Sequence, residues 1–337
     1  MALDVKVTIN LMEPNGKSGT WYPLVYVIGS GETMKGYKEY SSLSDVLEDY
    51  EAGTDAYKAA SLIFMQENAP SKIAILEGGS DVVAGLANYM NKSWRQLIVL
   101  KDFDATLATF IEATDKMYFT HFATKTELVA AAAAESNSIK EYENTFSVVY
   151  SDASATDPVK YPEAGVVGAT AGLKAGSFTY KNMVIKGIPA LDVSDSDLTE
   201  IHNAGGITII EKAGDTVTSE GIVASGEYAD VIDSKDYIIQ NITYKTQKLF
   251  NNNAKIPYTN NGIAMLEAAT LEALVDGYNN GMIADNDDGS PAYTVSFVLR
   301  SQTSDSDRAA RNYPYGQFSF VLSGAIHTAE IVGEINV

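Results

Sequence analysis

The chain has 337 residues, with 44 acidic and 24 basic side chains, three histidines and no cysteine. This length predicts two domains, or one large domain with extensions, and an apolar share of 45% can fill a sizeable core. The lack of cysteine excludes disulfides, thiolate nucleophiles and cysteine-ligated metal sites. A formal net charge of −20, spread along the chain, argues against a nucleic-acid partner, since affinity for phosphates comes from clustered lysine and arginine.

The first eleven residues alternate between apolar and polar side chains, which is the period of a half-buried β-strand. The apolar positions are Leu3, Val5, Val7, Ile9 and Leu11. A turn-rich segment at residues 13–19 follows, so the chain is predicted to open with a strand on a linker. We find no signal-peptide pattern and no apolar run near the roughly 18 residues of a membrane span, and we expect a soluble protein that is folded in a cytoplasm without membrane insertion.

From residue 23 to about residue 152, apolar runs alternate with helical patterns. The runs that predict strands are residues 23–29, 72–76, 96–100, 117–122 and 145–150. The helical patterns are residues 44–50, 55–66, 82–91, 105–114 and 127–135. Strands separated by helices of this length indicate crossover connections and a mostly parallel sheet flanked by helices. We therefore predict an α/β domain over residues 23–190, with an irregular last part that holds a short helix near residues 162–173.

A smaller α+β domain is predicted over residues 191–325. Ser194 resembles the N-cap of a helix that ends at Gly205-Gly206, and a hairpin of residues 207–212 and 216–223 should turn at Gly214-Asp215. The later elements are helices at residues 228–250 and 262–278, strands at 293–300, 317–322 and 326–337, and a polar loop at 301–312. Both ends of the chain are thus predicted strands.

Motifs for cofactor binding are incomplete. Gly29-Ser30-Gly31 follows a predicted strand, but Met34 stands where a dinucleotide-binding loop needs its third glycine. The same segment lacks the Lys–Ser/Thr pair of a phosphate loop. A turn that requires small residues explains this segment, and we predict no cofactor.

Residues for catalysis and metal binding are equally sparse. His121, His202 and His327 are far apart in the sequence, and no serine-hydrolase motif is present. The acidic stretch of residues 285–289 fails as a calcium loop, because its glycine in the sixth position would put Ala284 first and Val295 twelfth, where ligands are required. We predict no metal site and no enzyme activity.

The two terminal strands allow two interpretations. They can pair within their own subunit, as terminal strands commonly do, or complete the sheet of a neighbour by strand addition. In the last strand, apolar and polar residues alternate; the apolar ones are Ala329, Ile331, Ile335 and Val337. Exposed edges are normally blunted against pairing, and this one is not. The linker at residues 13–19 would let the first strand reach away from its own core.

The order of these features resembles the contractile tail sheath protein of bacteriophages and phage-tail-like particles. The resemblance is carried by GTDAYKAA at residues 53–60 before APSKIA at 69–74, LTEIHNAGGIT at 198–208, DSKDYI at 233–238 and TAEIV at 328–332. It covers most of the chain and is nearest to the compact group of sheath proteins, which lack large outward insertions. In many relatives a proline precedes the Ala–Glu pair, whereas this chain has His327-Thr328.

The resemblance implies a structural subunit that polymerises as a helical sleeve around a tail tube, between a baseplate and a tail terminator. Contraction of such a sleeve drives the tube through the host envelope, as in genome ejection. Residues 1–22 and 326–337 would be the linking arms. The C-terminal domain would face the tube, with Lys245 and Lys248 as candidate contacts. Such a protein would be found in the virion tail after assembly in the bacterial cytoplasm.

Two other functions stay open on the sequence. One is an α/β enzyme that acts on a small acidic or sugar-like substrate at the strand ends. The other is a tail tube protein or another phage structural protein.

Overall fold

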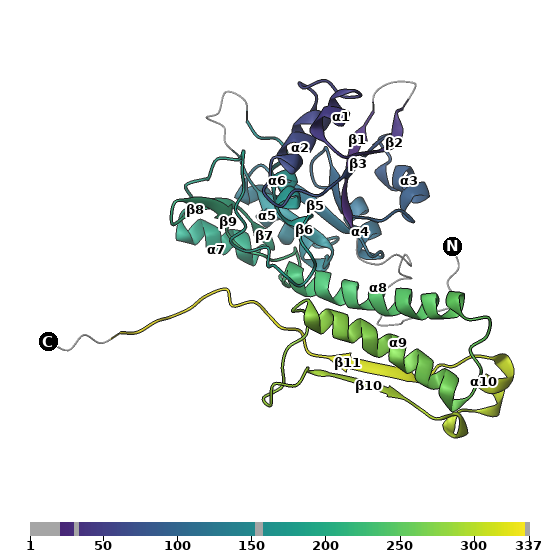
Figure 1. Ribbon diagram of the computed structural model, residues 1–337. Helices are drawn as coiled ribbons and strands as arrows, with labels where there is room; N and C mark the ends of the chain where they lie inside the picture. Colours follow the sequence, from purple (N-terminus) through teal and green to yellow (C-terminus); the bar gives the residue numbers. More distant parts are fainter. Residues whose placement is uncertain (1–20, 30–33, 152–157, 334–337) are drawn as a thin grey trace.

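The computed structural model describes residues 21–29, 34–151 and 158–333. Figure 1 shows a large α/β unit above a smaller unit, in which two long helices lie over a β-hairpin. After the hairpin, the tail contacts the large unit through His327, and its last described part extends away from both units (Figure 1). The predicted first strand, Leu3 to Leu11, and the predicted strand residues Ile335 and Val337 lie outside the described residues.

The large unit is built on a seven-stranded sheet in the order β2-β3-β1-β4-β5-β6-β7. The strands are β1 (Tyr22–Ile28), β2 (Gly36–Tyr40), β3 (Ile73–Gly78), β4 (Trp94–Val99), β5 (Met117–Phe122), β6 (Thr145–Val149) and β7 (Gly206–Ile207). All neighbours are parallel except β2, which is antiparallel to β3. The predicted mostly parallel sheet is confirmed. The sequence did not predict β2, because this edge strand is half exposed and carries Lys38 and Glu39 in place of an apolar run.

Helices cover both faces of this sheet. They are α1 (Leu43–Leu47), α2 (Asp55–Phe64), α3 (Val82–Leu86), α4 (Ala105–Glu112), α5 (Lys125–Ala132), α6 (Pro162–Thr170) and α7 (Asp195–Asn203). One core packs α1, α2 and α6 against the sheet, and a second packs α3, α4, α5 and α7 against the other face. Polar N-caps fix where several of these helices begin; Ser194, for example, accepts from the backbone N–H of Asp197.

The smaller unit has a core of its own. It is formed by α8 (Ala229–Asn252), α9 (Asn260–Asn279) and the antiparallel hairpin of β10 (Tyr293–Phe297) and β11 (Gly316–Phe320). Ile238 and Ile242 of α8 pack with Ala273 and Leu274 of α9, and the inward side chains of the hairpin close the cluster. The first turns of α8 belong to the core of the large unit instead, through Ala229 and Ile232.

The helix α8 therefore spans two cores. The change from one core to the next falls within this helix, whereas the sequence placed a domain boundary at residue 190. Residues beyond 190 still serve the large unit, because β7 pairs with β6 and Ile201 of α7 lies in its second core.

Three predicted segments differ from the structure. The second hairpin is β8 (Ile209–Lys212) with β9 (Asp215–Thr218), so it turns one residue early and ends at Thr218. Ala213 and Gly214 both have positive φ there, as the two central residues of a type I′ turn require. The loop at residues 301–312 contains α10 (Asp305–Ala310), too short to produce a helical period in the sequence but capped by Ser304. Residues 326–333 form no strand.

Candidate functional site

The C-terminal tail places apolar side chains in solvent. Ile326, Ile331 and Val332 are 90%, 92% and 88% exposed. Burying one such side chain stabilises a contact by about 1.5–3 kcal/mol. Among the predicted linking residues, Ala329 and Ile331 lie on this tail, with no strand beside them in the described part of the chain. The burial of these apolar side chains would therefore stabilise a complex with any partner that covers them.

The hairpin β10–β11 offers strand edges near the origin of this tail. Its alternate side chains pack on α9, and Phe318 and Phe320 stack on that face. In the ranges that the structure covers, no further strand joins the two outer edges; isolated bridges at Ile283 and Asp285 pair only with Leu322 and Pro291. Open edges present unpaired N–H and C=O groups, and a two-stranded sheet alone is marginally stable. The hairpin is thus suited to accept added strands.

Trp21 anchors the point at which the N-terminal segment joins the body. Its indole Nε1 donates to Oε1 of Gln240 on α8 over 3.1 Å. The guanidinium carbon Cζ of Arg95 lies 4.5 Å from the centre of the Trp21 ring. The ring of Tyr237 packs edge-on against the same indole. The N-terminal segment therefore joins the body at a residue that contacts both β4 and α8.

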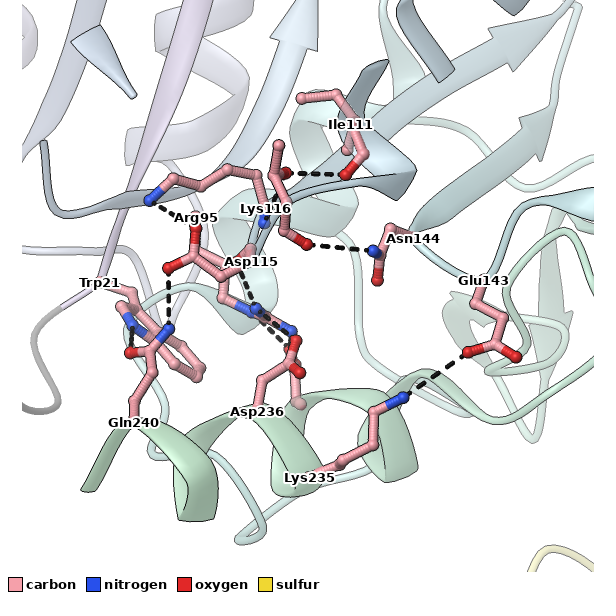
Figure 2. A network of polar contacts seen from close by, with 12 residues as sticks. Trp21, Arg95, Ile111, Asp115, Lys116, Glu143, Asn144, Lys235, Asp236 and Gln240 are labelled. Carbon is pink, nitrogen blue, oxygen red and sulfur yellow. Dashed lines mark hydrogen bonds and ion pairs between the residues drawn. The ribbon is translucent and has the colours of Figure 1, made fainter. Parts of the chain in front are cut away.

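Arg95 is the centre of a buried polar network at the joint between the two units (Figure 2). Its side chain is 1% exposed and donates through Nε to Asp233 Oδ1 over 2.8 Å. The same guanidinium lies 2.9 Å from Asp236 Oδ2 and donates to the Asp115 carbonyl over 2.8 Å. The second Asp233 oxygen accepts from Tyr180 over 2.7 Å. The network thus binds β4, the loop before β5 and α8 to each other.

The charges in this network depend on each other. Burial alone lowers the pKa of Arg95, but the carboxylates of Asp233 and Asp236 raise it above its ordinary value. Burial raises the pKa of Asp236, and the Arg95 charge opposes that rise. Removal of either partner of such a pair destabilises the protein, because the remaining charge is buried without compensation. The joint therefore fixes one orientation of α8 relative to the sheet.

The candidate tube contacts on α8 differ from each other in the structure. Lys245 is paired with Glu272 and, over 3.0 Å, with Asp276 of α9, and its side chain is 17% exposed. Lys248 is exposed. The Lys245 charge is therefore used to hold α8 against α9.

An exposed apolar stripe runs along α9 and was not predicted from the sequence. It is formed by Ala264, Ala268, Leu271 and Val275. Their spacing places them on one helix face, with Leu271 41% and Val275 36% exposed. The spacing was visible in the sequence, but Ile263 and Leu274 on the buried face give the same period and conceal it.

A cavity at the carboxyl ends of the strands bears on the enzyme hypothesis. A hollow of about 330 Å³ at the carboxyl ends of the strands is lined by Lys101, Asp102, His121 and Tyr161, among others. His121 Nδ1 lies 3.2 Å from Oε1 of the fully buried Glu163. Burial lowers the pKa of His121, but the Glu163 charge outweighs it and raises this pKa. The buried carboxylate of Glu163 is thus paired with a ring that lines the cavity.

The remaining candidate residues do not gather at one place. His202 Nε2 contacts Ser219 over 3.0 Å, and His327 lies on the tail. The acidic loop closes on itself, since Asp288 accepts from both the backbone and the hydroxyl of Ser290. Ser30 and Gly31 lie outside the described residues. Within the described ranges, no cluster of three or more potential metal ligands occurs, and no helix is long and apolar enough to cross a membrane.

The comparisons with known proteins agree with this architecture. Residues 229–335 match the family described as E217 tail sheath protein gp31-like, C-terminal domain. This match begins at the first residue of α8. No curated protein matches the sequence.

Among solved structures, a chain of the anti-feeding prophage baseplate aligns at a TM-score of 0.73 with 14% identity, over 100% of both chains. The sheath complex of the extracellular contractile injection system PVC, in its contracted state, aligns at 0.74 with 13% identity, over 100% of this chain and 99% of that one. The sheath tail protein of Listeria innocua aligns at 0.62 with 10% identity, over 83% and 89%. The chain therefore has the fold of contractile sheath proteins, and its residues 229–335 match the model of the gp31-like tail sheath C-terminal domain.

Proposed function

We propose that the protein is the structural subunit of a contractile tail sheath. In this function it polymerises as a helical sleeve around a tail tube and contracts to drive the tube through a host cell envelope. The observation that carries the proposal is the exposed apolar tail beside a hairpin with open edges. Pairing with copies of the same chain would bury these side chains and satisfy the open edges, and would therefore be favourable.

In the proposed lattice, residues 1–12 and 328–337 of neighbouring subunits add strands to the edges of β10 and β11. Each strand brings backbone hydrogen bonds, and its alternate apolar side chains cover the hairpin and its surroundings. The arms connect subunits that otherwise move as bodies. The buried Arg95 network supports this view, because it keeps the two units of one subunit in a fixed orientation while contacts between subunits change.

The smaller unit is proposed to face the tube. The support is the unpartnered stripe of Leu271 and Val275 on α9, which has acidic neighbours at Glu272 and Asp276. Lys248 stays a candidate contact, while Lys245 acts within the subunit. A baseplate and a tail terminator at the two ends of the sleeve, and assembly in a bacterial cytoplasm, complete the proposal.

Electron microscopy of the purified chain tests the arm hypothesis. We expect hollow sleeves of uniform diameter for the unaltered protein, and folded subunits without sleeves after deletion of residues 1–12. A sharper comparison uses one predicted strand: Val7→Asp changes its apolar face, and Thr8→Asp changes its polar face. We expect Val7→Asp to abolish sleeves and Thr8→Asp to retain them.

Three outcomes would contradict the proposal. Normal sleeves from the deletion variant would exclude an arm function for the first strand. A loss of thermal stability equal to that of a core variant would mean that this strand pairs within its own subunit. Discrete monomers or dimers of the unaltered chain at every salt concentration would favour the enzyme hypothesis, for which the cavity at His121 is the place to test binding.

A further inference from the structure

We propose that His327 is a positioning residue that latches the C-terminal arm to the large unit and thereby sets the point from which the arm reaches a neighbour. The ring is held on three sides. Nδ1 lies 3.0 Å from Glu220 Oε1, and Nε2 lies 2.9 Å from the hydroxyl of Thr179. The ring also meets the Tyr228 ring edge-on, with centroids 4.7 Å apart.

These contacts are confined to one residue of an otherwise exposed segment. Ile326 before the ring is 90% exposed, and Ile331 after it is 92% exposed, whereas the His327 side chain is 11% exposed. A single buried ring between exposed neighbours is the pattern of an anchor. It also joins the two units, because the tail starts in the small unit and Thr179 and Glu220 belong to the large one.

The receiving site is ordered independently of the tail. Glu220 also accepts from Lys181 Nζ over 2.6 Å and from the backbone N–H of Gly221 over 3.1 Å. Burial raises the pKa of Glu220, but these donors lower it below its ordinary value, so the carboxylate is ionised. Thr179 and Tyr228 lie on segments fixed by the large unit's core, through Tyr180 and Ala229. The Glu220 carboxylate and the Tyr228 ring are therefore held in place without the imidazole of His327.

The latch determines the length of the free arm. The last backbone contact before it is the bond from Ser323 N–H to the Met282 carbonyl, at 2.9 Å. With His327 bound, the described residues 328–333 have no backbone partner and span at most about 21 Å. With His327 released, the same count starts at residue 324, and residues 324–333 span at most about 35 Å. Release thus adds about 14 Å of reach without breaking the hairpin.

In the proposed sheath, the shorter arm would limit how far away a neighbour can lie, and release would lengthen the arm when subunits change places. This consequence rests on the proposed function. The latch itself is a property of the single subunit and is tested without assembly.

The test measures distances between spin labels on the dilute, unassembled full chain. The natural sequence has no cysteine, so Ile331→Cys on the arm and Val129→Cys on α5 give two defined sites, both exposed. We expect a narrow distance distribution that broadens in His327→Ala, with a tail that extends by up to about 14 Å. Thr328→Ala, on the same arm but exposed, is the matched control and should leave the distribution narrow.

Two variants of the residues that contact His327 test whether the broadening comes from loss of these contacts. Thr179→Val keeps the shape and removes the hydroxyl, and Glu220→Gln keeps the shape and removes the charge. Both should broaden the distribution in the direction of His327→Ala. The proposal is overturned if the unaltered chain already gives the broad distribution, or if His327→Ala matches Thr328→Ala. Absence of sleeves under the microscope, with an intact latch, would instead count against the sheath function alone.

Discussion

Arg95 is a residue whose partners decide its effect on stability. It is fully buried, and it neutralises Asp233 and Asp236 on successive positions of one face of α8. Removal of the guanidinium would leave two carboxylates in a region that water does not reach. The consequence is larger than the loss of one favourable contact, because the desolvation of the carboxylates is no longer offset.

We therefore expect Arg95→Met to lower the free energy of unfolding by about 3–5 kcal/mol. The matched control is Lys235→Met on the same helix, since the Lys235 pair with Glu143 is partly exposed and spans 3.6 Å. That variant should cost at most about 1 kcal/mol. Urea unfolding followed by circular dichroism measures both. Equal losses for the two variants would mean that the buried network does not secure the joint.

At the scale of elements, α6 and α2 are packed closely against each other. Every residue of α6 is buried, and Gly168 faces the backbone of α2. A Cβ placed on Gly168 would lie 2.5 Å from the Ile63 carbonyl oxygen, which cannot move without shifting the helix. The glycine is required for this approach, although glycine is a poor helix former.

Gly168→Ala is expected to destabilise the protein by about 1–3 kcal/mol, since overpacking against backbone exceeds the roughly 1 kcal/mol that alanine gains in helix propensity. Gly53→Ala serves as the control, because nothing lies near its added Cβ. We expect the control to stay within about 0.5 kcal/mol of the unaltered protein. A thermal melt that ranks Gly53→Ala below Gly168→Ala would show that the two helices are free to separate.

For the whole molecule, the net charge of −20 opposes the association that the arms favour. Like charges on two approaching subunits repel over a Debye length of about 30 Å at 0.01 M salt, and over only about 10 Å at 0.1 M. The short-range contacts of the arms are not screened in this way. Salt therefore shifts the balance toward the lattice.

Light scattering should consequently detect assembly that increases between 0.01 M and 0.3 M sodium chloride. The variant without residues 1–12 is the matched control, because the deletion removes one acidic and one basic residue, Asp4 and Lys6, and leaves the net charge at −20. It should stay unassembled at both concentrations. Assembly that falls as salt rises would indicate that attraction between opposite charges, and not the arms, holds the subunits together.

The parts of the protein that could be predicted from the sequence are those whose signals are local. Buried parallel strands are continuous apolar runs, so β1, β3, β4, β5 and β6 were all predicted close to their observed bounds. Amphipathic periods and N-caps located α2, α4, α7, α8 and α9 in the same way. Where the local signal is weak, as in the polar edge strand β2 and the six-residue α10, prediction from sequence failed.

The tertiary structure alone decided which distant residues meet. Arg95 finds Asp233 across 138 positions of the chain, and His327 finds Thr179 across 148. A periodic pattern reveals that a face is buried but not what covers it, so neither the joint nor the latch could be predicted. The charge was evident from the residues, and the order of the predicted elements already resembled that of sheath proteins. That an exposed tail follows a hairpin with open edges, and that one ring of this tail is held on the large unit, followed only from the three-dimensional arrangement, because no local pattern encodes such contacts.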